Sequence, residues 1–205
     1  RSTPLYSSAA SDVYKRQTLV GATTKFGMLS APLRDRFGSV YRLNFYSDLE
    51  MAEILNRSTK ILKIDSDNKG VEEIAIRSRK TPRIANRLLR RVRDFSEVQS
   101  DGKINVNIVK KALDLLEVDN LGLDKIDVEL LESLVKKFDG GPVGLQTLAA
   151  SISEDPNTVE DVIEPFLLNL GFISRTNRGR VATKLAYEHL GIDIKDEPSQ
   201  GTLLN

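Results

Sequence analysis

The chain has 205 residues, 40% of them hydrophobic and 29% charged, which allows one large folded domain or two small ones. Its formal net charge of +1 argues against a general polyanion binder but still permits local basic patches. The chain has no cysteine and a single histidine, His189, which excludes disulfides, thiolate zinc sites and the usual histidine metal centres, and no apolar run is long enough to span a membrane.

The N-terminal stretch RSTPLYSSAASDVYKRQ, residues 1–17, has no apolar periodicity, no initiator Met and no signal-peptide core. We interpret it as a non-native or disordered leader. In residues 18–48, two β-rich runs predict strands at 18–21 and 40–45, with a short helix at 30–37 between them. We therefore expect Thr18 to begin in the middle of a fold.

Residues 49–119 have a helical period and predict a small all-α bundle. The first helix should run for about four turns from Ser47, and a short second one should follow around Ile74. Thr81 and Pro82 suit the N-cap and first position of a third helix, and residues 106–116 predict a fourth.

Residues 122–192 predict a winged-helix domain, because three helices are followed by a β-hairpin. A polar linker, 117–127, precedes it and contains Gly122. Pro165 should bend the third helix, and Gly179 should supply a positive φ at the hairpin turn. The tail, residues 193–205, should be flexible. The chain is thus mostly α with some β.

Between Arg77 and Arg93 the chain has eight Lys or Arg and no acid. This run could be a nucleic-acid surface, a phosphate sensor or a solvated helix face. Arg83 lies in the first turn of its predicted helix, at the unfavourable end of the helix dipole for a cation. That placement favours a residue that grips an anion, although many such arginines are merely exposed.

The predicted hairpin carries Arg175, Arg178 and Arg180 within six residues. The third helix, which enters the major groove in a conventional helix-turn-helix domain, instead has Glu160, Asp161 and Glu164 on its expected outer face. Acids there would repel phosphates, so we expect the wing to contact DNA through phosphates or a narrow groove. The alternative is a solubilising hairpin in a protein-binding winged helix.

Four stretches together resemble the RuvB family of AAA+ ATPases, the bacterial Holliday-junction branch-migration motors. They are TLVGATTKFGMLSAPLRDRFGSVYRLNFY, TPRIANRLLRRVRDF, DKIDVELLESLVKKFDGGPVGLQTLAA and EDVIEPFLLNLGFISRTNRGRVATKLAYEHLGI. The resemblance runs in register from about residue 18 to residue 192. It implies the end of a large ATPase domain, a helical lid and a winged-helix head.

The resemblance also implies roles for individual residues. Thr24 or Thr23 would be the first sensor of the γ-phosphate, and Arg36, with Arg34 a close second, would be the arginine finger that reaches a neighbouring subunit's ATP. The remaining implied contacts are Tyr46 and Pro82 at the adenine, Arg83 as the second sensor, and Arg175 and Arg180 at the DNA. Arg87, Arg90, Arg91 and Arg93 would be solvated or face another subunit.

Two departures from the family pattern are visible. Lys80 stands where the family usually has Gly, so the lid geometry could differ slightly. No G-x-x-x-x-G-K-[ST] loop or Walker B strand occurs, so the chain alone should not hydrolyse ATP.

The resemblance implies a truncated subunit of a cytoplasmic homohexamer that uses ATP and Mg²⁺ in DNA recombination, DNA repair and the SOS response to DNA damage. Its partners would be double-stranded DNA at Holliday junctions, a RuvA-type junction-binding protein and a RuvC-type resolvase. The alternatives are a stand-alone winged-helix regulator, or another AAA+ protein of the initiator or clamp-loader type.

Overall fold

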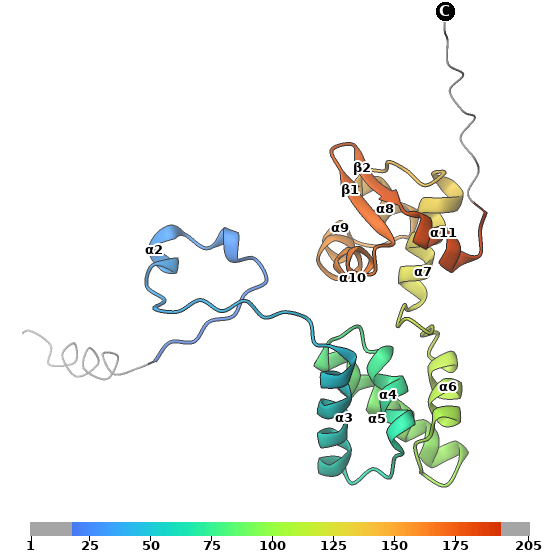
Figure 1. Cartoon of the computed structure of the whole chain (residues 1–205). Helices are drawn as coiled ribbons and strands as arrows, with labels where there is room; N and C mark the ends of the chain where they lie inside the picture. Colours follow the sequence, from blue (N-terminus) through green and yellow to red (C-terminus); the bar gives the residue numbers. More distant parts are fainter. Residues whose placement is uncertain (1–17, 194–205) are drawn as a thin grey trace, which may run out of the picture. The chain divides into compact units, whose positions relative to one another are not determined.

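A computed structural model describes residues 18–193, which fall into two units that divide between Asn44 and Phe45 (Figure 1). The leader expected at 1–17 and the tail from 194 onward lie outside the described residues. Within residues 18–193 no helix has the length and apolar character needed to cross a membrane.

Within residues 18–44, the N-terminal unit contains one 3₁₀ turn, Phe26–Met28, and one short helix, α2, Ala31–Arg34. The strands predicted at 18–21 and 40–45 are wrong, because neither stretch is paired in the structure. A strand exists only where a neighbouring strand takes up its N–H and C=O groups, and no described segment does so here. The apolar side chains of these stretches are consequently exposed, with Leu43 at 93%.

The second unit begins with the expected bundle of four α-helices. They are α3 Asp48–Leu62, α4 Asn68–Ile76, α5 Pro82–Gln99 and α6 Val106–Leu115. A capping box starts α3, since the Ser47 side chain accepts from the Glu50 N–H while the Glu50 carboxylate accepts from the Ser47 N–H. Pro82 opens α5 as predicted, although the Thr81 hydroxyl donates to the Arg79 carbonyl instead of capping the helix. The bundle buries a core that includes Met51, Leu55, Ile74, Leu89 and Leu113.

The head follows with the predicted order of three helices and a hairpin. Its elements are α7 Lys125–Glu132, extended by a π-helical segment Ser133–Lys137; α8 Leu145–Ser151; the third helix, formed by α9 Pro156–Thr158, a π-helical segment Val159–Ile163 and α10 Glu164–Asn169; β1 Ile173–Thr176; β2 Gly179–Ala182; and α11 Lys184–Leu190. Helix α11 was not expected from the sequence. The strands pair antiparallel, with Arg175 opposite Arg180. Gly179 has φ +140°, in the expected positive range.

The third helix differs from the prediction in its phase. Glu164, expected to face outward, is only 1% exposed, whereas the apolar Val162 is 61% exposed. The π-helical segment Val159–Ile163 lies directly before this point and before Pro165, which has no N–H to donate to the preceding turn. An extra residue per turn rotates the following side chains, so Glu164 points inward.

Candidate functional site

A third segment of the head pairs with the two-stranded hairpin of the wing. Val143 and Arg180 exchange both backbone hydrogen bonds, at 2.9 and 2.8 Å, and the Ala182 N–H donates to the Gly140 carbonyl at 2.8 Å. The GGPVG stretch therefore lies along β2 on the side away from β1. Arg180 therefore uses its own N–H and C=O on Val143, and it lies opposite Arg175 in the register with β1.

Two of the three predicted wing arginines share one carboxylate. Arg175 donates to the two oxygens of Glu164 at 2.6 and 2.9 Å, and Arg180 donates to the same oxygens at 3.1 and 3.0 Å. Burial alone would raise the pKa of Glu164, but the hydrogen bonds and charges of the two arginines outweigh it, so its pKa lies below the ordinary value. The prediction that Glu164 repels phosphates from an outer face is therefore wrong.

The Glu164 carboxylate offsets the charge repulsion that the strand register creates between the two arginines. Arg175 and Arg180 lie directly opposite each other, and like charges in that position repel. Glu164 between them leaves a net charge of +1 on the three side chains. The Arg175 side chain remains 47% exposed, whereas Arg180 is only 15% exposed, so the two have unequal access to a ligand.

Arg178 occupies the hairpin turn and is exposed. Its backbone N–H donates to the Thr176 hydroxyl at 3.2 Å, and its guanidinium has no ion-pair partner among residues 18–193. A free cation at the tip of a wing is suited to a phosphate contact that does not depend on sequence.

The basic run of residues 77–93 divides into three groups. Arg77 and Arg79 are withdrawn from the surface and paired with acids, as described below. Arg93 pairs with Asp94 and Glu97 on its own helix. The rest of the basic side chains on α5 are exposed and have no acid partner in the described part of the chain; these are Arg83, Arg87, Arg90 and Arg91. Lys80, just before α5, is likewise exposed and has no acid partner among the described residues, so five side chains of the run are free to meet an anion.

The residues expected at a nucleotide are divided between the two units. Thr24 and the exposed Arg36 belong to the N-terminal unit, where Arg34 lies 5.8 Å from the centre of the Phe26 ring. Tyr46, Pro82 and Arg83 belong to the second unit, the latter two in the first turn of α5. The exposed guanidinium groups of Arg36 and Arg83 suit phosphate oxygens, and the nucleotide role of the five residues stays a prediction.

Sequence reasoning missed the joint between bundle and head. Arg77 and Arg79 bond to groups 41 to 48 positions further along the chain, which no local pattern reveals. Arg79 meets Asp127, whose side chain is fully buried; burial chiefly raises the pKa of this carboxyl, to about 7, although Arg79 opposes the shift.

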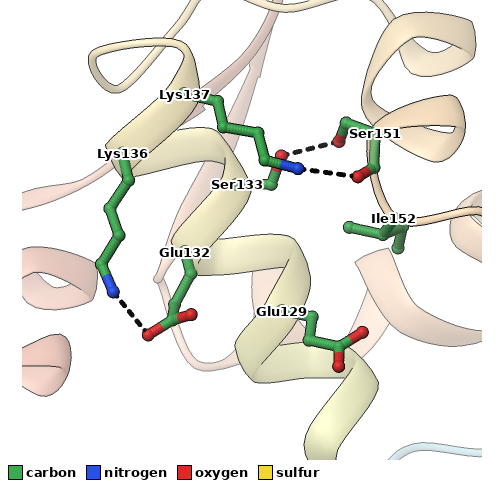
Figure 2. Close-up of a pocket in the computed structure, with 7 residues that line it drawn as sticks. All are labelled: Glu129, Glu132, Ser133, Lys136, Lys137, Ser151 and Ile152. Carbon is green, nitrogen blue, oxygen red and sulfur yellow. Dashed lines mark hydrogen bonds and ion pairs between the residues drawn. The ribbon is translucent and has the colours of Figure 1, made fainter.

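One shallow pocket of about 220 Å³ lies between the α7 end and α8 of the head, and it contains none of the predicted site residues (Figure 2). Lys136 pairs with Glu132 at 2.7 Å, and Lys137 donates to the Ser151 carbonyl at 2.9 Å. Lys136 and Glu132 thus neutralise each other, and the Lys137 ammonium is bound to a backbone carbonyl. Across residues 18–193, no cluster of three or more His, Asp or Glu side chains is arranged to hold a metal ion.

Comparison with known proteins gives three consecutive matches along this chain. The Holliday junction DNA helicase RuvB P-loop domain matches residues 7–43, the RuvB AAA lid domain matches 46–119, and the RuvB C-terminal winged helix domain matches 120–191. A curated relative, the Holliday junction branch migration complex subunit RuvB of Dehalococcoides mccartyi, is 56% identical over 180 residues. The chain belongs to the RuvB family.

The RuvB match covers 88% of this chain and 52% of the curated relative, so the chain spans about half of that protein's length. Among solved structures, the Thermotoga maritima RuvB Holliday junction branch migration motor is 44% identical, with a TM-score of 0.77 over 82% of this chain and 57% of that one. A lysine-to-arginine mutant of the same protein gives a TM-score of 0.78, covering 82% and 56%. The mostly helical fold, with a RuvB lid and winged helix, is thereby confirmed.

Proposed function

We propose that this chain supplies the sensors, lid and DNA-binding head of an ATP-driven motor that branch-migrates Holliday junctions. The observation that carries the proposal is the succession of P-loop-domain, lid and winged-helix matches in one chain. A stand-alone winged-helix regulator has no use for the first two, so that alternative is disfavoured.

Four solved Thermotoga maritima RuvB variants are substituted at positions that have counterparts in this chain. They replace an alanine, a threonine two positions later, an arginine 12 positions after that and a proline 46 positions further on. Ala22, Thr24, Arg36 and Pro82 have the same residue types at the same separations. This favours Thr24 over Thr23 as the first sensor, and Arg36 over Arg34 as the finger.

In this proposal ATP, bound with Mg²⁺, supplies the phosphoryl group whose transfer drives the motor. Arg36 offers a guanidinium to the negative charge that spreads over the phosphoryl oxygens in the transition state of a neighbouring subunit. Arg83 reads the phosphates of its own subunit, while Tyr46 and Pro82 line the adenine. A finger that acts on a neighbour requires the homohexamer.

The family relationship also supports a RuvA-type junction-binding partner, a RuvC-type resolvase, a role in the SOS response and a cytoplasmic location. The chain alone should lack ATPase activity, because it has no P-loop sequence to cradle the β- and γ-phosphates. Phosphate release that persists at constant specific activity through further purification of this chain would contradict that.

The wing is tested by DNA binding, measured as fluorescence anisotropy of short duplexes at several salt concentrations. Arg178→Ala should weaken binding to duplexes of unrelated sequence by similar factors, and should reduce the slope of log affinity against log salt by about 0.9. Lys136→Ala is the matched control, because it removes one positive charge from another surface of the head. Equal losses in both variants would rule out a wing-specific contact.

The finger is tested in a family member that contains the P-loop domain. Replacing the arginine equivalent to Arg36 by alanine should reduce turnover by roughly 10³–10⁵ and leave ATP binding largely intact. Mixing these subunits with P-loop-defective ones should restore some turnover at mixed interfaces. Hexamers that form from every mixture yet never recover turnover would exclude action in trans.

A further inference from the structure

The segment that joins the lid to the head is an ordered joint. One oxygen of Asp119 accepts from the Leu121 and Leu123 N–H groups, both at 2.8 Å, which closes residues 119–123 into a tight loop. The other oxygen lies 2.8 Å from Nε2 of His189, on α11 of the head. The linker predicted from its polar composition is therefore tied into the fold on the head side.

Arg77, at the end of α4, ties the joint to the lid. Its side chain is 2% exposed and donates to the Val118 carbonyl at 3.3 Å and to the Asn120 side chain at 2.8 Å, while Glu73 balances its charge at 2.7 Å. Gly122 passes so close that a Cβ there would lie 2.6 Å from the Arg77 carbonyl oxygen. Backbone and side chain of Arg77 thus both fit against the joint.

Arg79 crosses from the lid into the head. It donates to the Gly122 carbonyl at 2.9 Å, pairs with Asp124 at 2.7 Å, and forms a further hydrogen-bonded pair with the buried Asp127 in the first turn of α7. Its guanidinium also lies 4.8 Å from the centre of the Phe166 ring, on α10. A planar group with several fixed donors is suited to hold such an arrangement.

Lid and head are not joined by a shared apolar core. Among the described residues, the buried core of the lid and that of the head share no member. The polar contacts of Arg77, Arg79 and His189 are therefore the main ties that the structure shows between the two domains.

Through its chain neighbours and its contacts, Arg79 links the residues proposed to bind nucleotide with those proposed to bind DNA. Pro82 and Arg83 follow it within four positions, after a turn in which Arg79 and Lys80 both have φ +53°. Phe166, which its guanidinium covers, lies two positions after Glu164, the residue that holds the wing arginines. The start of α5 is therefore connected to the wing arginines through Arg79, Phe166 and Glu164.

We propose that Arg79 is a positioning residue that clamps the winged-helix head to the lid, so that the two turn as one rigid lever when the start of α5 responds to nucleotide. The functional part of this inference rests on the proposed function; the rigid joint itself does not. Arg79 touches neither the nucleotide nor the DNA in this proposal.

The joint can be tested on the whole chain by measuring a lid-to-head distance distribution with paired spin labels. The chain has no cysteine, so labels can be placed at Lys111→Cys on α6 and Asn157→Cys on α9, both exposed. The parent should give one narrow peak. Arg79→Ala should convert it into a broad distribution while circular dichroism shows both helical domains still folded. Arg93→Ala, which removes an arginine paired only within α5, should leave the peak narrow.

Asp127→Ala removes the buried head-side partner of Arg79, and it provides a second variant in case Arg79→Ala misfolds. It should broaden the distribution as Arg79→Ala does, and the double variant should broaden it little further, because both remove the same contact. A broad distribution in the parent, or a narrow peak in both single variants, would overturn the clamp. Duplex binding by the parent is measured separately; its absence would count against the proposed function and leave the distance result intact.

Discussion

Replacing Glu164 by alanine should destabilise the head strongly, because this residue of α10 holds both paired arginines of the wing. The carboxylate is 1% exposed and receives four hydrogen bonds of 2.6–3.1 Å from Arg175 and Arg180. Removing one partner of a buried ion pair typically costs about 3–5 kcal/mol. Arg175 is half exposed and can turn to water, which leaves Arg180 as the stranded charge. We therefore expect a loss near the lower limit, about 3 kcal/mol.

Glu160→Ala is the matched control, because Glu160 lies one turn earlier on the same helix. Its carboxylate is 45% exposed and lies 3.8 and 4.0 Å from the two arginines, so its loss should cost at most about 0.5 kcal/mol. Urea titrations followed by circular dichroism would give both free energies of unfolding. At about 4–8 °C per kcal/mol for a domain of this size, Glu164→Ala should also lower the head's Tm by more than about 10 °C.

Losses of unfolding free energy in Glu164→Ala and Glu160→Ala that agree within about 0.5 kcal/mol would refute the buried-anchor role of Glu164. That result would mean that solvent already screens the arginine pair and that burial of Glu164 contributes nothing. If Glu164→Ala lowers the free energy of unfolding but Glu164→Gln leaves it unchanged, packing and hydrogen bonding at this position matter and its charge does not.

Three further predictions concern the joint and its turn. Burial raises the pKa of Asp127 to about 7, above its ordinary value, so the folded chain keeps a proton that the unfolded chain has lost. Stability should therefore fall by about 2 kcal/mol between about pH 5 and pH 7, and urea titrations should show Asp127→Asn flattening that decline. Gly122→Ala should cost roughly 2–4 kcal/mol, because its Cβ would meet the Arg77 carbonyl at a positive φ. Gly102→Ala, with a similar φ but open space around it, should cost only about 1 kcal/mol by the same titration. Lys80→Gly should change stability by less than about 1 kcal/mol in the favourable direction, because relief of the left-handed φ is offset by a more flexible unfolded chain; a clear loss of thermal stability would contradict this.

The sequence alone was sufficient for features that depend on near neighbours in the chain. The capping residues before α3 and Pro82 at the start of α5 lie within one turn of the groups they affect. The apolar spacing of the lid helices and the turn before Gly179 are also local, and the head's order of helices and hairpin follows from them. Such elements are stabilised by backbone hydrogen bonds and caps spanning a few positions, which a linear pattern records.

Tertiary structure decided the points at which the prediction was wrong or silent. The stretches 18–21 and 40–45 have the composition of strands, but a strand requires a partner that composition does not provide. A π-helical segment before Pro165 turned Glu164 from an outward acid into the buried anchor of two arginines. From the sequence, Arg79 belongs to a basic run, but in the structure it is bound to groups more than 40 positions away. A charged side chain can bind a ligand when it is exposed, or hold two parts of the fold together when it is buried in an ion pair. Which of these occurs depends on the distant groups that surround it at low dielectric, and only the three-dimensional fold determines those groups.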